Sequence, residues 1–313
     1  MTDSVLINKK KKYESNILLI CCLGIAVAMV LIGDIIREEI YAALIYSSSI
    51  IIPSIFPFFV LSDFWSATFY FNENGIFPQT FKKFFGICGT GLVAFISGLI
   101  CGFPVGVKIA SGLYKDNCLS KRELEQICGF VNNPSIAFVI SGVGGGVFKD
   151  IRIGILLYIS VVISATIVGI AFREKNGISS NSTFKTKQSF NIVESIRSAG
   201  LNSINVISCI VFFSGVLGLL RGIIKNEIVV LFLSIFIEVT SAVKLIYSSH
   251  FSKTFKLILT AFALGFSGFS VHLQAFSFLP SEVSKKKYFI MKFFQGIISA
   301  LLILFITNIN RGC

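Results

Sequence analysis

The 313 residues are 54% hydrophobic and only 14% charged, with a mean hydropathy of +0.82 and a formal net charge of +12. A soluble domain carries roughly 25% charged residues, so this composition excludes a soluble protein and predicts an all-α polytopic membrane helix bundle. The lysines and arginines lie in loops between apolar runs and form no continuous basic face. That pattern excludes nucleic acid as a partner and follows the positive-inside rule.

The N-terminal residues 1–16 contain four successive lysines, Lys9 to Lys12, and are expected to lie in the cytoplasm. The apolar run at 17–33 is followed by Asp34 without a cleavage pattern, which predicts a retained anchor helix. Apolar length predicts about nine membrane-embedded segments in contact with lipid, at 17–33, 42–61, 91–109, 128–148, 153–172, 204–220, 228–247, 257–279 and 288–306.

A polar stretch at 173–198, rich in Ser, Asn, Lys and Arg, divides the chain and reads as a cytoplasmic linker. It separates a first membrane half at 17–172 from a second at 199–313. Lysine-rich flanks occur on both sides of the segments near Pro104 and Gly268. Two flanks on the same side of the membrane require an even number of crossings between them, so these two segments are predicted to be broken or re-entrant.

The two predicted breaks share a pattern that suggests related halves. The first reads GFPVGVK at 102–108 and the second GFSVHLQ at 268–274. Backbone that leaves a helix inside a membrane needs partners in the protein or in a wet cavity, so paired breaks of this kind indicate a transport site.

Polar residues near these breaks and inside apolar runs are the candidate solute-binding groups. Glu238 lies about half a helix from either end of its segment, where a carboxylate costs several kcal/mol unless it is paired or protonated. A Lys108–Glu238 pair between the halves is one hypothesis, and snorkelling of Lys108 to the interface is the alternative. The candidates are Gly102, Pro104, Lys108, Asn132, Asn133, Glu238, Thr240, Gly268, Ser270, His272 and Gln274.

Enzyme and metal chemistry find little support in the residues. Eight cysteines and two histidines form no clustered ligand set, so no metal site and no cofactor are expected. The sequence GFSG at 265–268 has the form found in rhomboid intramembrane proteases. His272 follows Ser267 by only five residues and is poorly placed as its base, so an enzyme is not expected. Asn132 and Asn133 either offer amides to a ligand or cap a helix.

Several of these motifs occur together, in order, in one known family. They are PSIFPFF at 53–59, GFPVGVK at 102–108, FVNNP at 130–134, FIEVTSAVK at 236–244 and LGFSGFSVHLQ at 264–274. With them the chain resembles the sporulation integral membrane proteins of YlbJ type, which carry a nucleoside-recognition or Gate domain. Ser241, Ala242 and Ser267 depart from the family pattern, which puts the shape of a pocket there in doubt.

The resemblance implies a role in endospore formation when the spore cortex is made, in the mother-cell or forespore membrane of a spore-forming bacterium. The Gate domain is similar to part of nucleoside transporters, which implies a small nucleoside-like or cortex-related solute. The competing hypothesis is a non-transporting membrane scaffold for the cortex machinery, with the breaks serving helix packing. Assembly into a homo-oligomer is compatible with either hypothesis.

Overall fold

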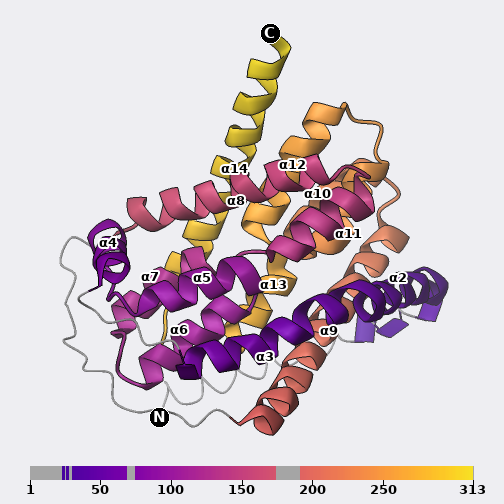
Figure 1. The fold of residues 1–313 in the computed structure, drawn as a ribbon. Coiled ribbons are helices and arrows are strands. Elements are labelled where there is room, and N and C mark those ends of the chain that lie inside the picture. Colours follow the sequence, from indigo (N-terminus) through magenta and orange to yellow (C-terminus); the bar gives the residue numbers. More distant parts are fainter. Residues whose placement is uncertain (1–22, 25, 28–29, 69–74, 174–190, 313) are drawn as a thin grey trace, which may run out of the picture.

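The computed structural model describes residues 23–312 except 25, 28–29, 69–74 and 174–190. The described residues form helices and connecting loops without a strand, which confirms the all-α class. The helices pack into one bundle, and the C-terminal end of α14, drawn in yellow, stands clear of it (Figure 1). The predicted cytoplasmic N-terminus and most of the predicted linker lie outside the described residues.

Each half contains a series of short helices that is followed by a long one. The first half consists of α2 (Gly33–Tyr46), a π-helical turn η1 (Ser47–Ile51), α3 (Ile52–Thr68), α4 (Ile76–Phe85), α5 (Gly91–Cys101), α6 (Val105–Lys115), α7 (Lys121–Val131), η2 (Phe138–Val147) and α8 (Ile151–Ala171). The second half consists of α9 (Ile192–Ile223), α10 (Glu227–Ile237), α11 (Val239–Ser248), α12 (Lys253–Phe266), α13 (Gly268–Phe276) and α14 (Lys286–Gly312).

Four helical stretches are long and apolar enough to cross a membrane, namely Ile151–Ala171, Ile192–Ile223, Lys253–Phe276 and Lys286–Asn308. A fifth is the pair Gly33–Ile51 and Ile55–Phe64, which is bent by 50°. The count of nine is therefore not confirmed in the part of the chain that the structure describes. Breaks divide the predicted segments at 91–109, 128–148 and 228–247 into helices of 10 or 11 residues, each about half of the length that a span needs.

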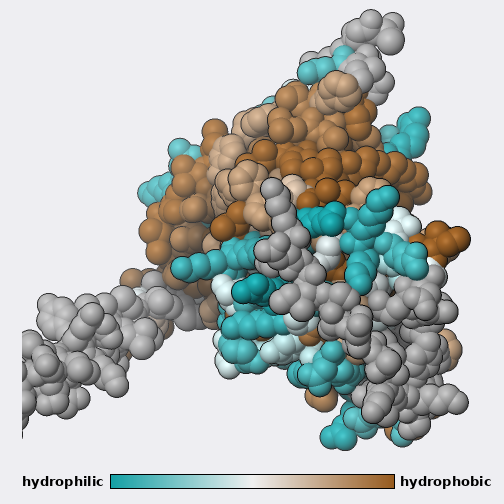
Figure 2. Space-filling model, turned by 90° about the vertical axis from the view of Figure 1, so that its left-hand side faces the viewer, coloured by the Kyte–Doolittle hydropathy of each residue, from teal (hydrophilic) through white to brown (hydrophobic). Residues whose placement is uncertain are grey.

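One side of α8 faces out of the bundle, and the opposite side is packed against other helices. Ile155, Ile159, Ile163 and Ile167 follow one another at four-residue intervals, and each is between 41% and 45% exposed. The opposite side of the same helix is buried in the bundle. Figure 2 shows a continuous apolar area over much of one face, with hydrophilic residues gathered beneath it. An apolar face of this kind fits contact with lipid.

The first predicted break reverses the direction of the chain. A Cβ added to Gly98 in α5 would lie 3.3 Å from the Cα of Gly106 in α6, although eight residues of continuous helix would separate them by about 12 Å. Gly102, at φ +85°, begins the turn between the two helices, a backbone conformation that glycine adopts without strain. α5 and α6 thus form a helical hairpin, the geometry expected of a re-entrant segment.

The second predicted break interrupts the helix without turning it back. Ser267 and Gly268 have φ values of 78° and 75°, and they separate α12 from α13. The two helices nevertheless run on as one stretch of 24 residues, Lys253–Phe276. Only the first of the two predicted segments therefore folds back on itself.

The lengths of five successive elements recur in the two halves. α5, α6, α7, η2 and α8 have 11, 11, 11, 10 and 21 residues, and α10 to α14 have 11, 10, 14, 9 and 27. α8 packs against α14, while α7 also contacts α14 and α12 also contacts α8. In this order the counterpart of the turn at Gly102 is the break at Glu238, and the counterpart of the break at 132–134 is Ser267.

Candidate functional site

Helix breaks from both halves meet at a buried cavity of about 30 Å³. Among the predicted site residues, Gly102, Glu238, Thr240 and Gln274 line it. The remaining lining residues are mostly apolar and come from η1, α3, α9, α11, α13 and the segments around 103 and 135 to 138: Ile50, Ile51, Ile55, Cys101, Phe103, Ser135, Phe138, Val206, Ile210, Val239 and Val271. The cavity thus brings together segments that are more than 130 positions apart in the sequence.

The size of the cavity limits what it holds in this arrangement. One water molecule needs roughly 10–15 Å³ of such space, so 30 Å³ admits about two waters. A nucleoside is much larger. In this sense the arrangement is closed, and a molecule larger than about two waters would fit only if the surrounding helices separated.

Glu238 acts as the N-cap of α11. One carboxylate oxygen accepts a hydrogen bond from the backbone N–H of Thr240 at 3.0 Å. The other accepts from the Thr240 hydroxyl at 2.6 Å and from the backbone N–H of Ser241 at 2.7 Å. The side chain is buried with its residue 1% exposed, and these donors explain how a carboxylate is tolerated there.

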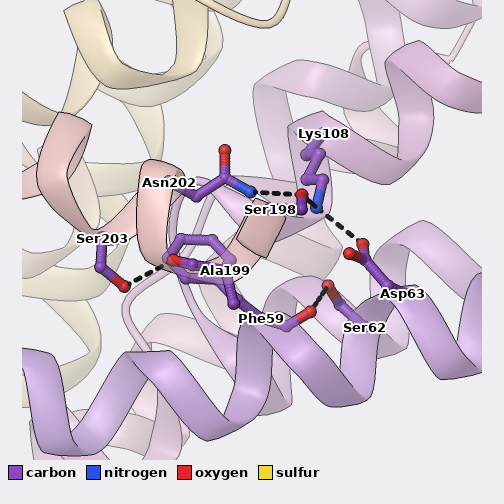
Figure 3. Close-up of polar contacts among 8 residues, drawn as sticks. All are labelled: Phe59, Ser62, Asp63, Lys108, Ser198, Ala199, Asn202 and Ser203. Atoms are coloured by element: carbon purple, nitrogen blue, oxygen red, sulfur yellow. Dashed lines mark hydrogen bonds and ion pairs between the residues drawn. The ribbon is translucent and has the colours of Figure 1, made fainter. Parts of the chain in front are cut away.

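Lys108 pairs with Asp63 rather than with Glu238, so the hypothesis of a Lys108–Glu238 pair is wrong. Its Nζ lies 2.7 Å from Asp63 Oδ1 on α3 and donates to Ser198 Oγ on α9 at 3.5 Å. Figure 3 shows Lys108 reaching down from α6 between these two helices. Asn202 adds a bond to Ser198 Oγ at 3.3 Å. The pair and its bond to Ser198 therefore join the α5–α6 hairpin to α3 in the first half and to α9 in the second.

A second polar centre surrounds the break after α7. Asn132 Nδ2 donates to the Tyr288 hydroxyl at 2.7 Å, and this hydroxyl is also 2.9 Å from Nδ1 of His272. Lys292 donates to the backbone carbonyl of Asn132 and to Oε1 of Gln295, both at 2.8 Å.

Gln295 completes this centre by joining it to Asn133. Its Nε2 donates to Oδ1 of Asn133 at 2.7 Å, and Nδ2 of Asn133 donates to the carbonyl of Phe130. Asn132, Asn133, His272, Lys292 and Gln295 are each 0% exposed. The paired asparagines thus bind other buried side chains in addition to closing the end of a helix.

The remaining predicted residues lie beside these two centres. Pro104 is the residue before α6, and Gly268 begins α13. Ser270 is buried on α13, where its hydroxyl accepts a weak bond from Gln274 Nε2 at 3.4 Å. Ser267 Oγ donates to the carbonyl of Leu264.

Some buried polar atoms have no hydrogen-bond partner among the described residues. Three of them belong to predicted site residues: Asn132 Oδ1, His272 Nε2 and Gln274 Oε1. Buried polar groups are normally paired, and exceptions point to a water, an ion or a ligand. Within the described part of the chain, no group of three or more His, Cys, Asp or Glu side chains could hold a metal ion.

The sequence analysis missed Asp63, Tyr288, Lys292 and Gln295. A signal for three of them exists in the sequence. Tyr288, Lys292, Gln295 and Ser299 follow at intervals of four, three and four residues, which places them on one face of α14. Ser299 Oγ lies 2.9 Å from Ser160 Oγ on α8, so this polar face points into the bundle.

One curated protein shows clear similarity to the chain. The sporulation integral membrane protein YlbJ of Bacillus subtilis (strain 168) is 25% identical over 301 residues, covering 82% of this chain and 73% of the relative. The chain is a homologue of YlbJ. That homology supports membership of the YlbJ-type family. It thereby also supports a sporulation-type integral membrane protein. No protein-family model matches the chain, and no solved structure matches it significantly.

Proposed function

We propose that this protein moves a small polar solute across a membrane during sporulation, at a site between its broken helices. The single observation that carries the proposal is the meeting of breaks from both halves at one buried cavity that contains Glu238 and Gln274. Broken helices supply backbone groups for binding and joints for movement, which is the arrangement of many secondary transporters.

The recurring order of elements in the two halves supports a particular kind of movement. In each half a pair of short helices, a broken helix and a long helix follow one another, and the two long helices α8 and α14 pack together. We take the halves as structurally related units that rock against each other around the cavity. Opening would enlarge a space that now holds about two waters.

Two observations support the choice of solute class, namely the Gate-type resemblance and the lining of the cavity. A nucleoside-like or cortex-related molecule combines an apolar ring or backbone with several hydrogen-bonding groups. The apolar walls and the few polar atoms of Thr240, Glu238 and Gln274 fit such a molecule. We place its action in the formation of the spore cortex.

The test is a thermal-shift screen of the purified full chain over nucleosides, nucleobases and cortex precursors. A ligand of this site should raise the melting temperature of the wild type and lose its effect in Gln274→Leu, a change of similar volume that removes the amide with its unpartnered oxygen. Leu273→Ala, at a half-exposed neighbour on α13, is the matched control and should keep the effect. A hit unchanged by Gln274→Leu would overturn this location. If none of the compounds raises the melting temperature of the folded protein, the result would favour the hypothesis of a non-transporting scaffold.

A further inference from the structure

Lys292 is fully buried on α14 and has no acidic partner among the described residues. It is 0% exposed, and it takes part in none of the four ion pairs found there. Its Nζ donates two hydrogen bonds, each 2.8 Å long, to the neutral oxygens of Asn132 and Gln295. No part of the proposed solute site explains a lysine in this place.

The hydrogen bonds of Lys292 match those of an uncharged amine. A buried ammonium without a counter-ion carries a desolvation cost that two neutral acceptors do not repay. An ammonium has three N–H donors, whereas a neutral amine has two, and both of these are used here. The geometry therefore favours the neutral form in this closed arrangement.

The groups around Lys292 supply no negative charge. The neighbouring titratable side chains are His272 on α13 and Tyr288 on the same helix, and Cys128 on α7 lies near Tyr288. The acids of α7 are engaged elsewhere, since Glu123 accepts from Cys88 and Ser120, and Glu125 accepts from Ser284. The charged residues of the two other helices packed on α14 are cations in their first turns: Arg152 on α8, and Lys253 and Lys256 on α12.

We propose that Lys292 is a proton-binding site, neutral in the closed state and protonated from water when the network around Asn132 opens. Protonation adds a third N–H donor to Nζ. The same network contains an unpartnered buried acceptor, Asn132 Oδ1, which a small rearrangement would offer to it. In the proposed transport cycle this proton would be the coupling ion, and that role rests on the proposed function, whereas the binding site itself does not.

The test measures melting temperature against pH for the full chain in detergent. Unfolding exposes the amine, which then takes up a proton, so stability should rise as pH increases from 7 to 9. The melting temperature of the wild type should therefore rise with pH relative to that of Lys292→Met, by an amount that corresponds to uptake of one proton on unfolding. Lys286→Met, at an exposed lysine on the same helix, is the control and should parallel the wild type. Parallel curves for wild type and Lys292→Met would overturn the proposal.

Two further variants keep the test decisive if Lys292→Met does not fold. Lys292→Gln is neutral and retains N–H donors, so it replaces Met in the same measurement. Lys292→Arg keeps a permanent charge, and we expect it to melt below the Gln variant at pH 8. An Arg variant as stable as the Gln variant would show that the site holds a cation and would overturn the proposal. Neither readout requires a solute, so an unsuccessful ligand screen leaves this test intact.

Discussion

Nζ of Lys108 lies 2.7 Å from Oδ1 of Asp63, and this ion pair links the α5–α6 hairpin to α3. Both side chains are about one-fifth exposed, so the pair is only partly shielded from solvent.

Removing one member of this pair should destabilise the protein more than removing both. Lys108→Met or Asp63→Leu removes one charge of this partly buried ion pair and leaves the other without its opposite charge at 2.7 Å, with an expected cost of about 1–3 kcal/mol. The double variant should recover part of that loss, which a double-mutant cycle of melting temperatures in detergent measures. The exchanged pair Lys108→Asp with Asp63→Lys is the charge control. Additive losses would show that the two side chains act independently.

Glu238 should contribute stability chiefly as a helix cap. Glu238→Ala leaves two buried backbone N–H groups and the Thr240 hydroxyl without their acceptor, at an expected cost of about 2–4 kcal/mol. Glu238→Gln keeps one oxygen and should cost less. Thermal unfolding provides the measurement, and Ser252→Ala, which removes an exposed cap of α12, should cost about 1 kcal/mol. A Glu238→Ala loss no greater than that of the control would contradict the capping role.

Close packing of the re-entrant hairpin depends on Gly106. A Cβ there would overlap the carbonyl oxygen of Val131 and lie 3.0 Å from the Cα of Gly98. We expect Gly106→Ala to cost more than about 2 kcal/mol, because backbone rather than a flexible side chain must move.

Gly112 on the same helix provides the matched control for Gly106. No atom lies within 4 Å of its added Cβ, so Gly112→Ala should be neutral or stabilising by up to about 1 kcal/mol. Melting temperatures of the two alanine variants decide the question. Equal values would mean that α6 does not approach Val131 as closely as described.

Removal of the Tyr288 hydroxyl should destabilise the protein more than removal of a tyrosine hydroxyl that makes only one hydrogen bond. Its hydroxyl connects Asn132 Nδ2 with His272 Nδ1, so Tyr288→Phe leaves two buried groups without their partner, at about 1–3 kcal/mol each. Tyr158→Phe removes one bond, to the carbonyl of Leu99, and serves for comparison. Chemical denaturation of both variants in the same detergent gives the difference, and a smaller effect at Tyr288 would contradict the network.

The positions of two helix breaks, near Pro104 and Gly268, were predictable because glycine and proline mark them. Gly102 and Gly268 adopt positive φ, which glycine tolerates and other residues avoid. The break at Glu238 has no such marker. A single extended residue separates α10 from α11, and its carboxylate was interpreted as a binding group because the sequence does not show that a new helix begins after it.

The number of spans was harder to predict from hydropathy. Apolar content does not distinguish one long helix from two short ones, so 128–148 and 228–247 read as single segments although each contains a break. Lys292 was missed because the three lysines at 285–287, where α14 begins, draw attention to the flank of the apolar run rather than to its interior. Only the spacing of Tyr288, Lys292, Gln295 and Ser299 distinguishes an inward-facing polar side from chance polarity.

The tightness of the central cavity also affects the membrane that contains this protein. A space for about two waters, enclosed largely by aliphatic and aromatic side chains, offers no continuous hydrated path for ions. Substitution of a bulky wall residue such as Phe103 or Phe138 by alanine would widen this space, and increased ion permeability of reconstituted vesicles should first appear in such variants.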